Sequence, residues 1–139
     1  MKPKDIYKST AWKYFSRYVL LYYSDGLFAR CITCDRILEI NKPDCHCGHL
    51  IKVTDGYSTV FEFENTGVQC LQCNRLGGGM QDVMKKRLAR LHGEDKIESL
   101  YVQRRVVCKL DKYTLDLLAK EWKSKFDDLV KIKGNPWRK

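Results

Sequence analysis

Apolar residues recur at helical spacing near the start of the chain, with basic residues on the opposite side. The stripe consists of Ala11, Trp12, Phe15, Tyr18, Val19, Leu21 and Tyr22. Ser9 or Thr10 can cap this helix, and the turn residues at 24–26 end it. Residues 1–8 are polar and lack an apolar block, so we expect a loose arm there.

Two further segments in the second half of the chain show helical periodicity. Over 80–92, Val83, Met84, Leu88 and Leu91 form a stripe opposite a basic side, and Gly93 closes the helix. Residues 94–100 add a short helix. The clearest helix runs over 112–132, and its apolar face is expected to pack on the N-terminal helix or on a second subunit. That face comprises Leu115, Leu118, Ala119, Trp122, Phe126, Leu129 and Val130.

The middle of the chain reads as short strands. Residues 27–31 and 49–53 are strand candidates, Asp55-Gly56 is a hairpin turn, and the β-branched and aromatic run over 57–63 is a returning strand. The pattern therefore predicts an α+β fold in which His49 stands on a β-ribbon.

Length and charge narrow the class of protein. The chain of 139 residues is the size of one domain, so we treat 1–139 as a single domain. Its parts are an N-terminal helix (1–26), a core (27–79) and basic and amphipathic helices (80–139). Lysine and arginine number 26 against 17 acidic residues, which gives a net charge of +9. This balance favours an anionic partner, nucleic acid first and an acidic membrane surface second.

Several features predict a cytoplasmic protein. Residues 1–10 do not resemble a cleaved signal sequence. The most apolar run, at 18–23, is much shorter than the roughly 20 residues that a spanning helix needs. Seven cysteines without a signal peptide indicate metal binding rather than a disulfide framework.

Two Cys-x-x-Cys pairs carry the strongest chemical signal. Cys31 and Cys34 form the first pair, and Cys70 and Cys73 form the second. Two intervening residues let both sulfurs of a turn face one tetrahedral ion, so the pairs predict a single structural Zn²⁺ site. Buried free thiols or a redox pair would not account for two matched turns. The lone Cys108 is typical of a small buried residue.

The segment between the pairs holds residues suited to a second metal. In Cys45-His46-Cys47-Gly48-His49, His46 alternates with two cysteines and would point away from them in an extended chain. Gly48 permits a close backbone approach before His49. Asn65 stands five residues before Cys70, and Asn74 directly follows Cys73. Either His46 or Cys47 remains an alternative ligand for the zinc.

These motifs carry a family resemblance. A Cys-x-x-Cys pair, a Gly-His on a β-ribbon, and an asparagine five residues before Cys-x-x-Cys-Asn resemble the HNH, or ββα-metal, nucleases. More specifically, the chain resembles the phage NinG family, also called Rap, of recombination endonucleases that act on branched DNA. The resemblance extends to the leading helix and to the Gly-Glu-Asp-Lys-Ile-Glu stretch at 93–98. The layout is also similar to that of the endonuclease VII type of junction resolvase.

The resemblance implies a role for each residue of the motif. His49 matches the general base, and a neutral imidazole suits that role. Asn74 matches a ligand of a catalytic Mg²⁺ or Mn²⁺, and Asn65 matches the asparagine that fixes the ribbon and the base. His46 stands where relatives have an aspartate, so it becomes the second metal contact and favours softer metals than Mg²⁺. Gly77 stands where relatives often have a lysine, and 77–79 reads as a flexible hinge.

Basic residues after the motif are candidates for contacts with DNA phosphates. A solvated basic face is the alternative reading. Such contacts would bind any sequence and would weaken with salt. The candidates are Lys85, Lys86, Arg87, Arg90, Arg104 and Arg105.

The resemblance implies a metal-dependent endonuclease that cuts branched DNA, such as Holliday junctions or D-loops, in phage recombination. The expected location is then the host cell cytoplasm. A homodimer is attractive because a junction cutter needs two active sites for paired nicks. The alternatives are an HNH nuclease that nicks or cuts ordinary duplex DNA and a zinc-stabilised DNA-binding protein without catalysis.

Overall fold

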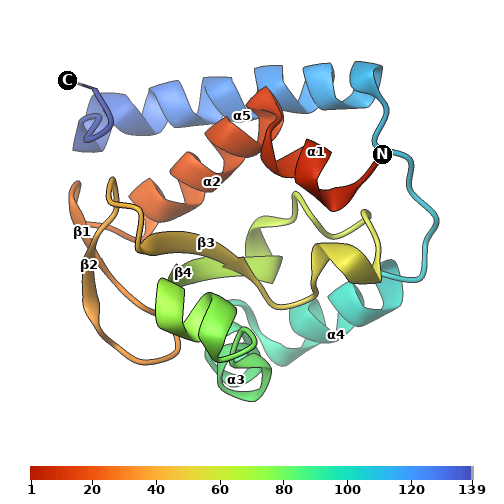
Figure 1. The fold of residues 1–139 in the computed structure, drawn as a ribbon, viewed down its shortest axis with the longest axis horizontal. Helices are drawn as coiled ribbons and strands as arrows, with labels where there is room; N and C mark the ends of the chain where they lie inside the picture. Colours follow the sequence, from red (N-terminus) through yellow and green to blue (C-terminus); the bar gives the residue numbers. More distant parts are fainter. Residues whose placement is uncertain (139) are drawn as a thin grey trace.

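The computed structural model describes residues 1–138 and shows a mixed α+β fold. Figure 1 shows α5 lying across α1 and α2 on one side, the β3–β4 hairpin in the middle, and α3 and α4 on the other side. The helices are α1 (Pro3–Tyr7), α2 (Thr10–Tyr22), α3 (Gln81–His92), α4 (Glu94–Gln103) and α5 (Lys112–Lys133). The strands are β1 (Phe28–Arg30), β2 (Ile37–Glu39), β3 (Cys45–His49) and β4 (Thr66–Cys70).

The three long helices predicted from periodicity are confirmed. Ser9 caps α2 by accepting a hydrogen bond from the backbone N–H of Trp12 at 3.1 Å. Helices α2 and α5 share the most extensive contact between elements, so the apolar face of α5 packs on the N-terminal helix. Phe15 and Trp122 meet edge to face at this contact, with ring centroids 4.7 Å apart.

The expectation of a loose arm at the N-terminus was wrong. Pro3 begins the short helix α1, where the missing N–H of proline costs no hydrogen bond. Asp5 accepts a hydrogen bond from the backbone N–H of Lys2 at 2.9 Å. The side chain of Ile6 is fully buried in a cluster with Val53 and Val60. Burial of this one isoleucine fixes a segment whose sequence is otherwise polar.

The strand predictions were correct for β1 and wrong for the segments over 49–53 and 57–63. His49 ends β3, and a 3₁₀ turn, η1 (Val53–Asp55), and further turns follow. The strand that returns beside β3 is β4, and a second 3₁₀ turn, η2 (Phe63–Asn65), leads into it. The apolar residues of 57–63 pack in the core as turns, because burial is available to them there without a strand partner.

Two antiparallel hairpins position the motifs. In the β1–β2 hairpin Ala29 faces Leu38, and in the β3–β4 hairpin Cys45 faces Cys70 and His49 faces Thr66. The π-helical turn η3 (Gln72–Leu76) follows β4 directly. Among the described residues, no helix is long and apolar enough to cross a membrane.

Candidate functional site

The sulfur atoms of Cys31, Cys34, Cys70 and Cys73 converge, as the sequence predicted. All four lie within 4.8 Å of one another, which places them within metal-binding distance. The Cys34 and Cys70 sulfurs are 3.8 Å apart. A tetrahedral zinc with bonds of about 2.3 Å requires sulfur separations of about 3.8 Å. Within residues 1–138 this is the only such group of three or more cysteine, histidine or acidic side chains.

Local hydrogen bonds prepare the cluster for a metal. The backbone N–H of Cys70 donates to the Cys31 sulfur, and that of Cys73 donates to the Cys70 sulfur, both at 3.4 Å. Burial raises the pKa of the Cys31 thiol, but hydrogen bonds from the Thr33 hydroxyl and nearby backbone N–H groups outweigh it and lower that pKa to about 6. These bonds favour the thiolate form at Cys31, whereas burial, the largest influence, raises the pKa of Cys34 and that of Cys73.

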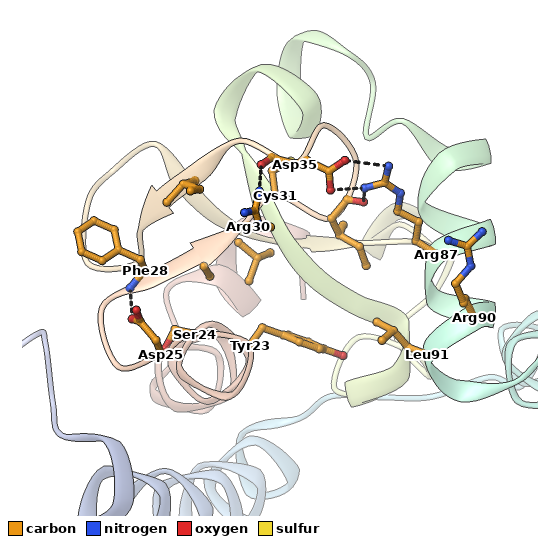
Figure 2. Close-up of a pocket in the computed structure, with 14 residues that line it drawn as sticks. Tyr23, Ser24, Asp25, Phe28, Arg30, Cys31, Asp35, Arg87, Arg90 and Leu91 are labelled. Carbon is orange, nitrogen blue, oxygen red and sulfur yellow. Dashed lines mark hydrogen bonds and ion pairs between the residues drawn. The ribbon is translucent and has the colours of Figure 1, made fainter.

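Helix α3 is attached to the first cysteine pair through Arg87. Its guanidinium donates to both carboxylate oxygens of Asp35 at 2.8 and 3.1 Å and to the carbonyl of Ile32 at 2.9 Å (Figure 2). The bidentate geometry fixes Asp35, which has a positive φ of 66°. Figure 2 shows Arg90 beside Arg87 on the rim of the same hollow. Arg87, predicted as a DNA contact, thus attaches the first cysteine pair to α3.

The central hairpin is closely packed at Gly48. A Cβ atom added at Gly48 would lie 2.0 Å from the side-chain oxygen of Gln69, so only glycine fits this position. Gln69 is fully buried and donates to the hydroxyl of Thr33 at 3.2 Å and to the carbonyl of Gly79 at 2.8 Å. The close approach expected at Gly48 therefore serves a side chain that links the first cysteine turn to the 77–79 segment.

His46 and Asn74 meet directly. Nε2 of His46 lies 3.0 Å from the carbonyl oxygen of Pro43, which only accepts hydrogen bonds, so Nε2 carries the proton. Nδ1 then presents a lone pair, and the Asn74 amide donates to it at 2.9 Å. Burial, the largest influence, lowers the pKa of His46, which keeps the ring neutral near pH 7. A metal-binding histidine typically has its N–H held by a carbonyl, as in His46, but the Nδ1 lone pair of His46 is occupied here by the Asn74 amide.

His49 has the same tautomer in a more enclosed place. Its Nε2–H donates to the carbonyl oxygen of Val60 at 3.0 Å, so the lone pair of the ring is on Nδ1. The ring stacks on Trp12 with centroids 5.1 Å apart, and only 7% of the residue is exposed. Burial lowers the pKa of His49 to about 4, although the Val60 carbonyl partly opposes this shift. The ring of His49 is therefore neutral at physiological pH.

Asn65 braces the loop that approaches His49. Its side-chain oxygen accepts from the backbone N–H of Ile51 at 2.8 Å, and its nitrogen donates to the carbonyls of Ile51 and Thr59 at 3.1 and 3.0 Å. Thr59 directly precedes Val60, the residue that accepts from His49. Asn65 thus fixes both ends of the loop over 51–60.

A cleft of about 660 Å³ brings His46, His49 and Asn74 together. None of the described residues that line it is acidic, and Lys52 and Arg75 add positive charge. Gln81 also lines the cleft, and its side-chain nitrogen is buried with no hydrogen-bond partner in the described structure. Sequence reasoning missed these three residues. Only Arg75 could have been predicted from the sequence, because it directly follows Asn74 of the motif.

The remaining basic candidates lie outside this cleft. Lys85 pairs with Glu98 at 3.4 Å and lies over the ring of Tyr101, and Arg104 lies over the same ring. Arg105 lines a separate shallow pocket with Arg104, and Lys86 is exposed on α3. The structure thus brings Lys85 and Arg104 together but places Arg87 and Arg90 on the hollow of Figure 2.

Comparisons of the chain with known protein families, with curated proteins and with solved structures found no match. The fold and the site therefore define the protein at a coarse level: an α+β chain with a four-cysteine cluster arranged to bind a metal.

Proposed function

We propose that the chain is a zinc-stabilised, metal-dependent DNA endonuclease of the ββα-metal type that cuts branched DNA. One observation carries the proposal. His46 and Asn74, which are 28 positions apart, meet at 2.9 Å in a basic cleft that also contains His49. In both histidines Nε2–H donates to a backbone carbonyl, so Nδ1 carries the lone pair.

The four-cysteine cluster would have a structural role. Four thiolates close the coordination shell of zinc and leave no position for a substrate. The metal would join the turn after β1 to the turn after β4, and so fix Asn74 directly behind Cys73. Such a site contributes to folding rather than to chemistry.

The residues of the cleft fit a weakly held divalent cation. The Nδ1 atom of His46 and the amide oxygen of Asn74 would hold it, and both are neutral donors. The Asn74 amide donates to this Nδ1 in the structure, so it would have to turn its oxygen toward the cation. Because no acidic side chain lines the cleft, the DNA phosphate would supply the anionic ligands. An imidazole ligand favours Mn²⁺ over Mg²⁺. When bound, the cation would stabilise negative charge on the phosphate oxygens.

The protein side chains would perform the proton transfer and hold the strand. Nδ1 of neutral His49 would take a proton from water as the water oxygen bonds to phosphorus and the bond to the 3′ oxygen breaks. The 3′ oxygen would then take a proton from solvent. Asn65 would keep the loop carrying Val60 in place, so that His49 retains its tautomer. Lys52, Arg75 and Gln81 would contact phosphates.

A noncatalytic DNA-binding protein is the second candidate, and the enclosure of His49 favours it. Trp12 stacks on the ring, and the residue is 7% exposed. In that case the histidine would be a core residue, and the basic cleft would bind DNA without cutting it.

One experiment separates these proposals. Zinc-loaded protein is incubated with a labelled four-way junction and a matched linear duplex, with Mg²⁺ or Mn²⁺. The proposal predicts cutting of the junction, faster in Mn²⁺, and little cutting of the duplex. Equal rates on both DNAs would favour an enzyme for ordinary duplex. Binding without cutting in either metal would leave the noncatalytic protein as the better description.

A further inference from the structure

The end of η3 exposes a large apolar side chain next in sequence to residues that line the cleft. Leu76 is 80% exposed and follows Asn74 and Arg75, which line the cleft. A leucine in water gains about 1.5–3 kcal/mol when it is fully buried. Single exposed leucines are common on protein surfaces, so the neighbourhood of this one decides its meaning.

The segment that presents Leu76 is fixed to the metal cluster. The N–H of Gly77 donates to the carbonyl of Gln72 at 2.6 Å, and the N–H of Gly79 donates to the carbonyl of Cys73 at 2.9 Å. The buried side chain of Gln69 donates to the carbonyl of Gly79 at 2.8 Å. The 77–79 segment, interpreted from sequence as a flexible hinge, is therefore a hydrogen-bonded turn anchored on both sides.

The same turn has a bare backbone at Gly78. Gly78 has a φ of +66°, and an added Cβ there would meet nothing within 4 Å. Three successive glycines follow Leu76, although the Met80 sulfur lies close to Gly77 and the Gln81 side chain lies close to Gly79. A flat partner could approach this backbone closely, with Leu76 as the projecting group. No residue from 71 to 81 is acidic, and Asp82 follows in the first turn of α3.

We propose that Leu76 is an apolar wedge that enters a distorted base step when the cleft holds a DNA strand. The inference rests on the proposed function and names the feature of DNA that the site would select. Apolar side chains that enter a base step unstack it at a cost of a few kcal/mol. That cost is smallest where stacking is already interrupted, as at a branch point. The wedge therefore favours branched over regular duplex DNA, a choice that His49, His46 and Asn74 do not make.

The test measures unstacking without cutting. A four-way junction carries the fluorescent base 2-aminopurine at the branch point, and a matched duplex carries it at an internal step. Zinc-loaded wild type, Leu76→Ala and Leu76→Phe are added with Mg²⁺ and Mn²⁺ withheld. Ile132→Ala is the matched control, because Ile132 is also 80% exposed but lies on α5. Anisotropy of a separate label reports binding.

Wild type, Leu76→Phe and Ile132→Ala should raise the junction fluorescence severalfold. Leu76→Ala should give less than half that rise at saturation and should bind the junction about five- to tenfold more weakly. Its thermal midpoint should match that of wild type, because an exposed leucine contributes little to folding. An equal rise with Leu76→Ala would overturn the wedge, as would an equal loss with Ile132→Ala. A change in oligomeric state of Leu76→Ala without DNA would instead identify a contact between copies and also overturn it.

The two proposals fail in different ways. Cutting in Mn²⁺ is measured on the same DNAs. If the fluorescence pattern holds and no variant cuts, the wedge stands and the nuclease proposal fails. If Leu76→Ala cuts and unstacks the junction as wild type does, the nuclease proposal stands and the wedge fails.

Discussion

The Nε2–H of His49 donates to the carbonyl oxygen of Val60 across 3.0 Å, and this contact determines which ring nitrogen can act as a base. A histidine that used Nε2 as a base would have to lose this hydrogen bond. With Nε2 protonated, Nδ1 carries the lone pair. The same reasoning applies to His46 and the carbonyl of Pro43, so backbone carbonyls select the tautomer of both cleft histidines.

Replacing His49 should remove cutting and keep binding. Loss of a general base costs about 10²–10⁴ in rate, and the basic residues of the cleft remain in His49→Ala. His92→Ala is the control, because His92 bonds to Tyr23 and does not line the cleft. Single-turnover cutting and anisotropy on the same junction give both quantities. Undiminished cutting by His49→Ala would remove this residue from the mechanism.

The activity should persist into mildly acidic conditions. Because burial lowers the pKa of His49 to about 4, the ring stays neutral, and thus competent as a base, throughout the range above that value. A solvent-exposed histidine would lose activity near pH 6.5. Trp12→Ala exposes the ring to water, so its pKa should rise and the acid limb of kcat/KM should move upward.

Profiles of kcat/KM between pH 5 and 8 for the wild type and Trp12→Ala check this expectation. Zinc content is followed in parallel, since protonation of thiolates releases metal. A wild-type midpoint near 6.5 with full zinc would contradict a buried base. No shift in Trp12→Ala would show that Trp12 does not control the hydration of His49.

Zinc should be bound with one ion per chain and should stabilise the fold. Cys34→Ser and Cys73→Ser each remove one of four ligands and should lose the ion together with cooperative unfolding. Cys108→Ala and Cys45→Ala should keep it, because neither sulfur belongs to the cluster. Metal analysis and thermal melts with and without chelator measure both effects. Retention of zinc by Cys73→Ser, or its loss from Cys45→Ala, would show that the ligand assignment is wrong.

The sequence predicted those parts whose signal is local. The apolar face of α5 can be predicted because its helical repeat continues over 22 residues. Each Cys-x-x-Cys turn can be predicted because its two ligands lie only three positions apart. Helix α1 gave no such signal, since Ile6 alone anchors it and its partners Val53 and Leu110 are far away in the sequence. Local patterns do not show which distant segment will supply burial.

The residues of the cleft likewise divide into those that a local motif predicts and those that only the folded structure brings in. His46, His49, Asn65 and Asn74 were found because motif spacing names them. Trp12 and Gln81 come from other elements: α2, which carries Trp12, packs on β3, and Gln81 begins α3. The carbonyls of Pro43 and Val60 are invisible to any motif, because every residue type has one. Yet they set the tautomers on which the proposed chemistry depends.

Asn65 should be the most sensitive polar residue of the core. It is fully buried and makes three side-chain hydrogen bonds, so Asn65→Ala leaves the N–H and the carbonyl of Ile51 without partners, while the carbonyl of Thr59 keeps the N–H of Glu62 at 3.3 Å. We expect a loss of roughly 2–4 kcal/mol in the free energy of unfolding. Asn41→Ala is the control: Asn41 makes one such bond, to Pro136, and should cost about 1 kcal/mol.

The isosteric variant Asn65→Asp separates shape from hydrogen bonding. An oxygen would replace the nitrogen that faces the carbonyls of Ile51 and Thr59, so a carboxylate there is repelled and buried without a counter-ion. A protonated carboxyl has one O–H to donate and restores part of the brace. Because burial raises the pKa of such a group, Asn65→Asp should lose less stability relative to wild type at pH 5 than at pH 8. Urea unfolding of the zinc-loaded proteins at both pH values measures the difference, and a pH-independent loss would show that shape alone, and not the donor, is what Asn65 provides.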